Sequence, residues 1–143
     1  MSLHCVRAYG HMLEALQSLP VEAWPPKVML HSYGGSAEMV PQFAALPQLD
    51  QQADDSWAED AGGRVYFSFS AAIAAKTPDK TAALMRVVPD DRLLIETDLG
   101  SVEPMNEALR TVVQMVADAK GWDVERATEQ TWANFCEFYE GHL

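Results

Sequence analysis

The sequence predicts an α/β fold in which helices cover a parallel sheet. Four short apolar runs alternate with longer stretches whose apolar residues recur at helical spacing. Proline and glycine separate several of these segments, as turns between strands and helices require. Repeated strand–helix units imply parallel strands with helices outside the sheet. The 143 residues are expected to form one domain, residues 1–143.

The first two units occupy the N-terminal third of the chain. A strand is expected over residues 2–6, and apolar residues at helical spacing predict a helix over residues 9–19. After a proline-rich break, residues 27–31 have the compact apolar pattern of a buried strand. A helix is then expected over residues 37–46, with Ser36 as its N-cap.

The rest of the chain is expected to hold two strands and three helices. Residues 48–63 are polar and acidic, which indicates a solvated loop. The strands are expected over residues 64–70 and 92–98. The helices are expected over residues 77–87, 104–120 and 123–139, and a proline at the first position of the first helix suits its start.

The number of strand–helix units limits the architecture. A complete (β/α)₈ barrel of the TIM type takes about 250 residues. Four units in a chain of 143 residues therefore look like half of one. The apolar pattern alone leaves a second architecture open, a small doubly wound sheet of four strands.

Charge and cysteine content narrow the function. A formal net charge of −11 argues against binding nucleic acid through a broad basic surface, because neutralising phosphates requires Lys and Arg. Bound divalent cations would reverse the sign locally, so a metal-dependent phosphodiesterase is compatible with this charge. Cys5 and Cys136 are too few for a disulfide framework and indicate reduced thiols in an intracellular protein, cytoplasmic or nuclear. No membrane span or secretory signal is expected.

Polar residues end all four predicted strands: His4, His31, Ser70 and Asp98. Reactive groups collect at the carboxyl ends of strands in a βα barrel or an open parallel sheet. Two histidines and a carboxylate at one rim are ligands that a divalent-metal hydrolase uses. The alternatives are that each histidine is a hydrogen-bonded structural residue, that Asp98 caps the following segment, and that Glu96 faces a helix and pairs with an arginine.

Five segments of the chain form a recognisable series. They are residues 3–8 (LHCVRA), 30–36 (LHSYGGS), 66–70 (YFSFS), 93–98 (LLIETD) and 131–139 (TWANFCEFY). In this order and over essentially the whole chain, they resemble landmarks of the TatD deoxyribonuclease family. Residues 3–8 resemble the family's fourth-strand histidine motif, and residues 131–139 resemble its terminal helix, in which an asparagine precedes an aromatic residue.

This resemblance implies a barrel hydrolase with one or two divalent metal ions, Zn, Mg or Mn, that cleaves the phosphodiester bonds of DNA with a metal-activated water. His4 and His31 would be the two ligands of the second metal. Asp98, after the last barrel strand, would contact the first metal and orient or deprotonate the attacking water. Glu96 would support catalysis by holding that strand end or a substrate contact.

The chain also departs from the family. The family's paired histidines on the first strand and its bridging glutamate on the third strand have no counterpart, because the resemblance begins at the fourth strand. We therefore expect roughly the C-terminal half of a barrel, weak or inactive alone, with two sheet edges open to self-association. One alternative is a non-catalytic, partner-binding protein derived from the same barrel. Another is a barrel amidohydrolase that acts on a C–N bond.

The glycines after the second strand raise one further question. Gly34 and Gly35 precede a predicted helix and resemble a turn that cradles phosphate with its backbone N–H groups. The alternative is an ordinary strand-to-helix turn, in which paired glycines are common.

Overall fold

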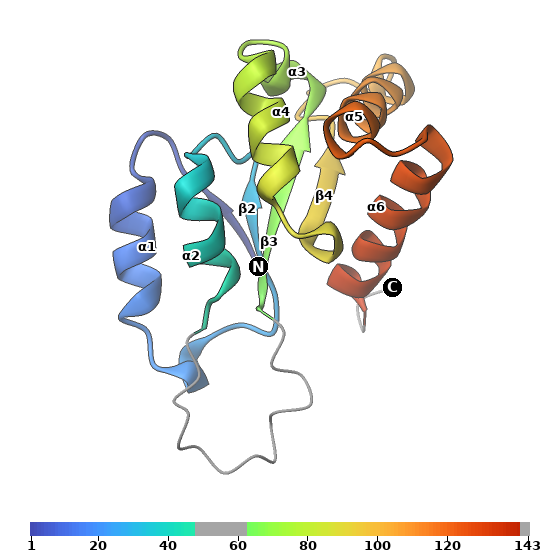
Figure 1. Cartoon of the computed structure of the whole chain (residues 1–143). Helices are drawn as coiled ribbons and strands as arrows, with labels where there is room; N and C mark the ends of the chain where they lie inside the picture. Colours follow the sequence, from blue (N-terminus) through green and yellow to red (C-terminus); the bar gives the residue numbers. More distant parts are fainter. Residues whose placement is uncertain (48–62, 141–143) are drawn as a thin grey trace.

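Figure 1 shows the computed structural model of the chain, which describes residues 1–47 and 63–140. Within these residues, four strands form a sheet in the order β1-β2-β3-β4, and every neighbouring pair is parallel. The strands are β1 (Ser2–His4), β2 (Val28–His31), β3 (Val65–Ser70) and β4 (Leu93–Glu96). The predicted α/β fold with a parallel sheet is confirmed, and each strand lies within its predicted run.

Helical segments connect and follow the strands. They are α1 (Tyr9–Gln17), α2 (Val40–Ala44), α3 (Ala71–Ala74), α4 (Pro78–Val87), α5 (Met105–Lys120) and α6 (Val124–Tyr139), with short 3₁₀ turns η1 (Val21–Ala23), η2 (Ala37–Met39) and η4 (Asp90–Arg92). Gly121 ends α5 with a left-handed φ of 68°, and the Asp123 side chain caps α6 by accepting from the N–H of Arg126. No helix among the described residues has both the length and the apolar character of a membrane crossing.

Two predictions around these helices need correction. The helix expected over residues 37–46 is a 3₁₀ turn followed by the short α2, with Pro41 in its first turn, where a missing N–H does least harm. Ser36 is the N-cap residue of η2, as predicted, but its side chain makes no capping hydrogen bond. The short helix α3 was not predicted from the sequence. The loop expected over residues 48–63 lies outside the described residues except for Gly63.

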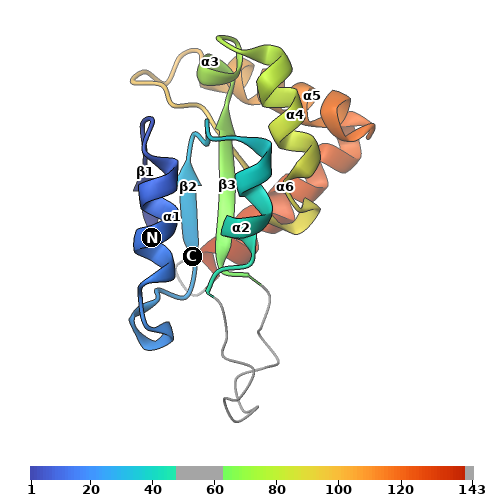
Figure 2. The same cartoon turned by 60° about the vertical axis from the view of Figure 1, so that its left-hand side comes forward.

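One face of the sheet forms the main core. Alternate strand residues on this face pack against the helices, and Figures 1 and 2 show α2 and α4 on the same side of the sheet. Its fully buried strand residues are Val28, Leu30, Val65, Phe67, Phe69 and Leu93. The intervening residues of each strand form the second face of the sheet, and the candidate site residues of the strands lie on it.

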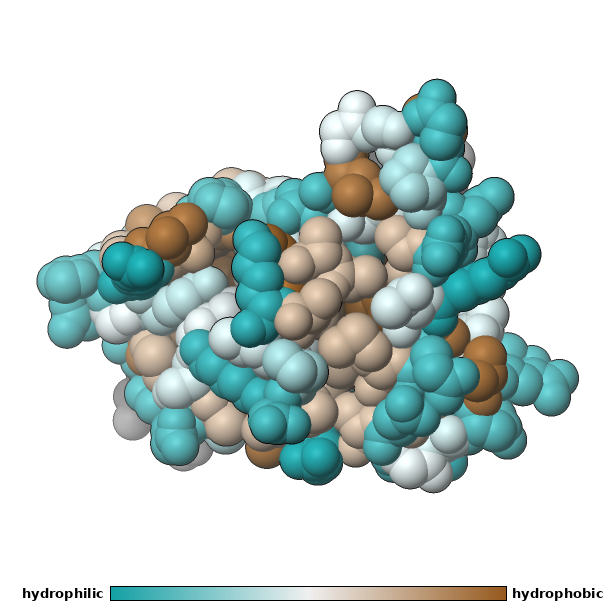
Figure 3. All heavy atoms as spheres, turned by 90° about the horizontal axis from the view of Figure 1, so that it is seen from above, coloured by the Kyte–Doolittle hydropathy of each residue, from teal (hydrophilic) through white to brown (hydrophobic). Residues whose placement is uncertain are grey.

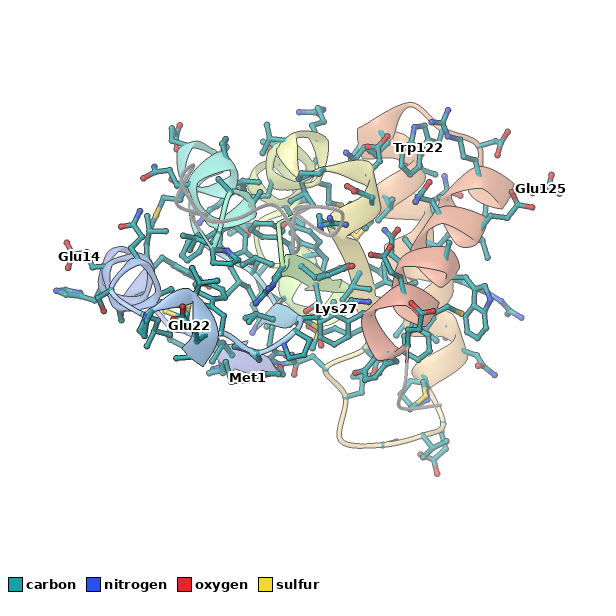
Figure 4. The ribbon with its side chains drawn as sticks, turned by 90° about the horizontal axis from the view of Figure 1, so that it is seen from below. Met1, Glu14, Glu22, Lys27, Trp122 and Glu125 are labelled. Carbon is teal, nitrogen blue, oxygen red and sulfur yellow. The ribbon has the colours of Figure 1, made fainter. Side chains whose placement is uncertain are left out.

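The second face is apolar near the strand starts and polar near the strand ends. Tyr66 and Leu94 are buried there beneath Phe138 of α6, and Met29 packs at the margin. Figure 4 views this end from below, where Met1 and Lys27 mark the starts of β1 and β2. Lys27 donates from Nζ to the backbone carbonyl of Glu137 on α6. The end of α6 therefore covers the lower part of this face and leaves the upper part to polar residues.

Side chains from the last two helices fix the entry into β4. Asn134 on α6 is 1% exposed, and its Nδ2 donates to the carbonyls of Asp90 (2.7 Å) and Leu93 (2.8 Å). Lys120 at the end of α5 donates to the Val88 carbonyl (2.6 Å) and pairs with the Asp90 carboxylate (2.7 Å). These contacts provide donors for carbonyls of the turn before β4 and of its first residue, Leu93.

Candidate functional site

The two predicted histidines stand side by side at the rim. His4 and His31 are register partners at the ends of β1 and β2, and their ring centroids are 5.5 Å apart. Carboxyl ends of parallel strands lie at one edge of the sheet, so both rings project from the second face. Figure 3 looks down on this rim, where hydrophilic residues surround a central area of intermediate hydropathy.

Asp98 approaches the two histidines from the opposite edge of the described sheet, where it follows β4. Its Oδ1 lies 3.3 Å from His31 Nε2. Asp98 comes two residues after β4 and does not cap α5, because the N-cap position of that helix is Pro104. Figure 2 shows the segment between β4 and α5 projecting beyond the strand ends. The structure therefore brings His4, His31 and Asp98 to one rim, with His31 in the middle.

Glu96 lies between the histidine and two serines. Its Oε2 is 2.7 Å from His31 Nδ1. Its Oε1 accepts from the N–H (2.9 Å) and Oγ (2.7 Å) of Ser32 and from Oγ of Ser68 (2.8 Å). The alternative of an arginine partner is wrong, since these groups occupy both carboxylate oxygens. Four donors hold this carboxylate, and the side chain is only 18% exposed.

Backbone strain collects at the same rim. The described non-glycine residues with positive φ are Arg7 (59°), Ser32 (45°) and Asp98 (52°). Each follows a strand end by one to three residues. A left-handed conformation at a non-glycine residue is uncommon and persists only where its surroundings hold it, which is typical of functional sites.

The two serines of β3 have different roles. Ser70, one of the four predicted strand-end groups, caps α3 by accepting from the N–H of Ile73 (3.4 Å), and its Oγ lies 3.2 Å from Ser32 Oγ. Ser68 was missed, although it touches Glu96. The sequence does contain a signal for Ser68. In the buried run 65–70, every second residue from Tyr66 lies on the second face of the sheet, and a buried serine there needs a polar partner.

The Gly34–Gly35 turn is structural. The Gly34 N–H donates to the hydroxyl of Tyr9 (2.9 Å), and its carbonyl accepts from Lys80 Nζ (2.6 Å). Gly35 is buried against Tyr33, whose hydroxyl donates to the Ser36 carbonyl (3.0 Å). Burial raises the pKa of both Tyr9 and Tyr33, so both phenols stay protonated at neutral pH. Because the Gly34 N–H already has an acceptor, these contacts favour the ordinary-turn alternative.

Replacing Gly35 by alanine is expected to destabilise the protein by about 1–3 kcal/mol, the usual penalty for overpacking. The added Cβ would lie 2.5 Å from Cζ of Tyr33, whose ring is packed edge-on against Tyr9 and Phe67. Gly10→Ala is the matched control, because it meets nothing within 4 Å on α1 and should stabilise by about 0.5–1 kcal/mol. Urea denaturation measures both. Equal stabilities would contradict the Tyr33 packing.

Metal-binding capacity is partial. Across residues 1–47 and 63–140, no three His, Cys, Asp or Glu side chains are gathered closely enough to enclose an ion by themselves. His31 makes close approaches to Asp98 and Glu96, while His4 faces His31 through its ring. The described rim thus supplies neighbouring donors and not a closed cage.

Two solved structures place this fold within a barrel. The chain matches an uncharacterized amidohydrolase from Saccharomyces cerevisiae with a TM-score of 0.65 and 13% identity, over 96% of this chain and 52% of that one. It matches a TatD family hydrolase from Entamoeba histolytica with a TM-score of 0.63 and 12% identity, over 97% of this chain and 50% of that one. The fold is that of about half of a (β/α) barrel, as predicted.

Sequence comparison identifies the family. The family model described as TatD related DNase matches residues 1–140. The Cut9-interacting protein scn1 of Schizosaccharomyces pombe is 33% identical over 151 residues, which cover 87% of this chain and 41% of that protein. The chain belongs to the TatD-related DNase family, and it spans less than half the length of this curated relative.

Proposed function

We propose that this chain forms the C-terminal half of a metal-dependent hydrolase that cleaves phosphodiester bonds of DNA. The observation that carries the proposal is the position of His31, between the carboxylates of Asp98 and Glu96 and beside His4. Family membership supports the reaction class. His4, His31 and Asp98 are the proposed ligands.

One pair of donor atoms at the rim has the spacing of two ligands of a divalent cation. Two ligand atoms about 2.0–2.1 Å from a tetrahedral zinc ion stand about 3.3 Å apart. His31 Nε2 and Asp98 Oδ1 are separated by 3.3 Å. If His31 Nδ1 carries the proton toward Glu96, Nε2 and Asp98 Oδ1 face each other as two acceptors. A divalent cation bound by both atoms would remove the repulsion between them, as a shared proton would.

The chain's own residues would divide the work. A bound cation would supply an activated water and charge stabilisation of the leaving oxygen. Asp98, whose side chain is 36% exposed, can accept a proton from a water or hold it in place. Glu96 has no free oxygen for this task, because donors from three residues occupy it. We therefore assign proton transfer to Asp98.

The net charge adds a requirement. At −11, the chain would repel a polyanionic substrate. Cations at the rim would invert the local field and attract a phosphate group. Both DNA binding and DNA hydrolysis are thus expected to depend on the divalent cation.

The chain spans about half the length of the barrel structures it matches, which bears on what it can do in isolation. In the part of the chain that the structure describes, β1 pairs only with β2 and β4 only with β3. An open strand edge is a template for pairing with another strand. We propose that further strands, from a longer gene product or from an associating chain, complete the barrel and the cation site. The isolated chain is expected to be weakly active or inactive and prone to self-association.

Chelation tests the proposed function directly. Single- and double-stranded oligonucleotides are incubated with the 143-residue chain and with the longest gene product that contains it. Hydrolysis by the longer product should vanish with EDTA and return with Zn²⁺, Mn²⁺ or Mg²⁺. Hydrolysis that EDTA leaves unchanged would contradict metal dependence. Cleavage of an amide or cyclic amide without cleavage of DNA would favour the amidohydrolase alternative.

A second candidate is a non-catalytic, partner-binding protein. The name of the fission yeast relative records an interaction with Cut9. This reading predicts that calorimetry detects no divalent-cation binding to the longer product and that it hydrolyses neither class of substrate. Cation binding with DNA hydrolysis would exclude it.

A further inference from the structure

We propose that Glu96 is a positioning residue that holds His31 in the tautomer with its proton on Nδ1, and that the Ser32 backbone N–H enforces this choice. The family resemblance implies that Glu96 supports catalysis by holding its strand end or a substrate contact; we propose instead that it acts through His31. The consequence for cation binding rests on the proposed function, whereas the tautomer itself does not.

The Glu96 carboxylate is fixed by donors that converge on one oxygen. Ser32 N–H, Ser32 Oγ and Ser68 Oγ lie 2.9, 2.7 and 2.8 Å from Oε1. These donors come from the end of β2 and from β3, and the carboxylate comes from the end of β4. Charge-assisted bonds of this length are the stronger kind. The side chain therefore cannot turn without breaking three of them.

The second oxygen then determines the proton on His31. Oε2 lies 2.7 Å from Nδ1, and an ionised carboxylate can only accept a hydrogen bond. Nδ1 must therefore be the donor. In the neutral ring the other nitrogen, Nε2, is left with its lone pair directed at Asp98, 3.3 Å away. Second partners of this kind commonly set the tautomer and orientation of metal-binding histidines.

The strained backbone of Ser32 contributes to the same arrangement. Ser32 directly follows His31 and has a φ of 45°, a left-handed conformation that is strained for a serine. This turn lets both the N–H and the Oγ of one residue point at Glu96 Oε1. The strained backbone of Ser32 therefore directs its N–H, which can only donate a hydrogen bond, at the Glu96 carboxylate.

Glu96→Gln separates this role from simple packing. Hydroxyl groups of Ser32 and Ser68 can rotate to become acceptors, but the Ser32 backbone N–H can only donate. The Ser32 N–H also lies 3.0 Å from Ser68 Oγ, but an NH₂ group at the Oε1 position would still face this N–H as a second donor at 2.9 Å. The carboxamide is therefore expected to place its oxygen at the Oε1 position and its NH₂ toward His31. His31 Nδ1 then becomes an acceptor, and the proton moves to Nε2. Elsewhere, an isosteric carboxylate-to-amide exchange behind a catalytic histidine costs about 10⁴-fold in rate through the wrong tautomer.

Nitrogen NMR of histidine-labelled, EDTA-treated protein reads the tautomer without any activity. Long-range ¹H–¹⁵N spectra are recorded at a pH where the ring carries one proton, and His31→Gln assigns the signal. The expected result is Nδ1–H in the natural protein and Nε2–H in Glu96→Gln. A natural protein with the proton on Nε2 overturns the proposal, even if the variant does not fold. Retention of Nδ1–H in a folded Glu96→Gln overturns it as well.

Calorimetric titration of Zn²⁺ into the longest gene product that contains this chain forms the second arm, because the cation site is proposed to be complete only there. Glu96→Gln should lower the affinity by about 10–100-fold, the usual effect of removing such a partner. Glu14→Gln, an isosteric change at an exposed position of α1, should leave both readouts unchanged. If neither the natural protein nor any variant binds Zn²⁺ but the tautomer switches, the positioning role stands and the proposed function fails. If Zn²⁺ binds equally to all while the tautomer does not switch, the positioning role fails alone.

Discussion

Replacing Asp98 by asparagine is expected to lower the rate of phosphodiester hydrolysis by about 10²- to 10⁴-fold in the product that contains a complete barrel. The carboxylate lies 3.3 Å from His31 Nε2 and is 36% exposed, so it can reach both a cation and a water molecule. Asparagine keeps the size of the side chain and tolerates the φ of 52° at this position, but it cannot take up a proton. Steady-state kcat and KM on one oligonucleotide measure the change.

Asparagine is a cleaner replacement than alanine here, because alanine would add strain at a left-handed residue. Asp118→Asn on α5 is the matched control. Asp118 is exposed and only accepts from Gln114 Nε2, a bond that an amide oxygen can also accept. Its kcat should be unchanged. A kcat for Asp98→Asn within about twofold of the unmodified enzyme would remove Asp98 from the chemistry.

Replacing Asn134 by aspartate is expected to destabilise the fold by about 4 kcal/mol. Both hydrogen bonds from Nδ2 would be lost, leaving the Asp90 and Leu93 carbonyls unsatisfied, at about 1–3 kcal/mol each. A carboxylate oxygen would also face these two acceptors at a position that is 1% exposed. This loss is a large fraction of the total stability of a typical domain. The free energy of unfolding in urea measures it.

Asn106→Asp gives the matched comparison. Asn106 is exposed in the first turn of α5, where a negative charge is favourable or neutral. Its stability should equal or slightly exceed that of the natural sequence. If Asn134→Asp is as stable as Asn106→Asp, the hydrogen bonds of Asn134 to the turn before β4 contribute nothing.

Periodicity and turn chemistry sufficed to predict the strands and the long helices. The run 93–98 and the helix after Gly121 follow directly from apolar spacing and capping residues. The short α3 could not be predicted, because a helix of four residues is too short to show a helical repeat of apolar residues. Its start is marked by the Ser70 side chain, which accepts a hydrogen bond from the Ile73 N–H. Likewise, η2 and α2 replaced one predicted helix because the position of Pro41 decides where the α-helical bonds begin.

The candidate site was predictable as a set of residues and not as a network. Strand-end positions indicated His4, His31 and Asp98 without any coordinates. The same reasoning could not show that Glu96 binds His31 and two serines, because those contacts join β2, β3 and β4 through the register of the sheet. Asn134 belongs to the terminal-helix motif of the sequence, but only the structure shows that its side chain donates to the carbonyls of Asp90 and Leu93.

The contacts that Asn134 and Lys120 make with this turn have a consequence for the order of folding. The strand that carries Glu96 is anchored at its entry by helices that are translated after it. A nascent chain can therefore contain every residue of the rim and still lack a settled fourth strand. We therefore expect the rim to reach its final geometry only after α6 docks, although none of the rim contacts described above comes from α6.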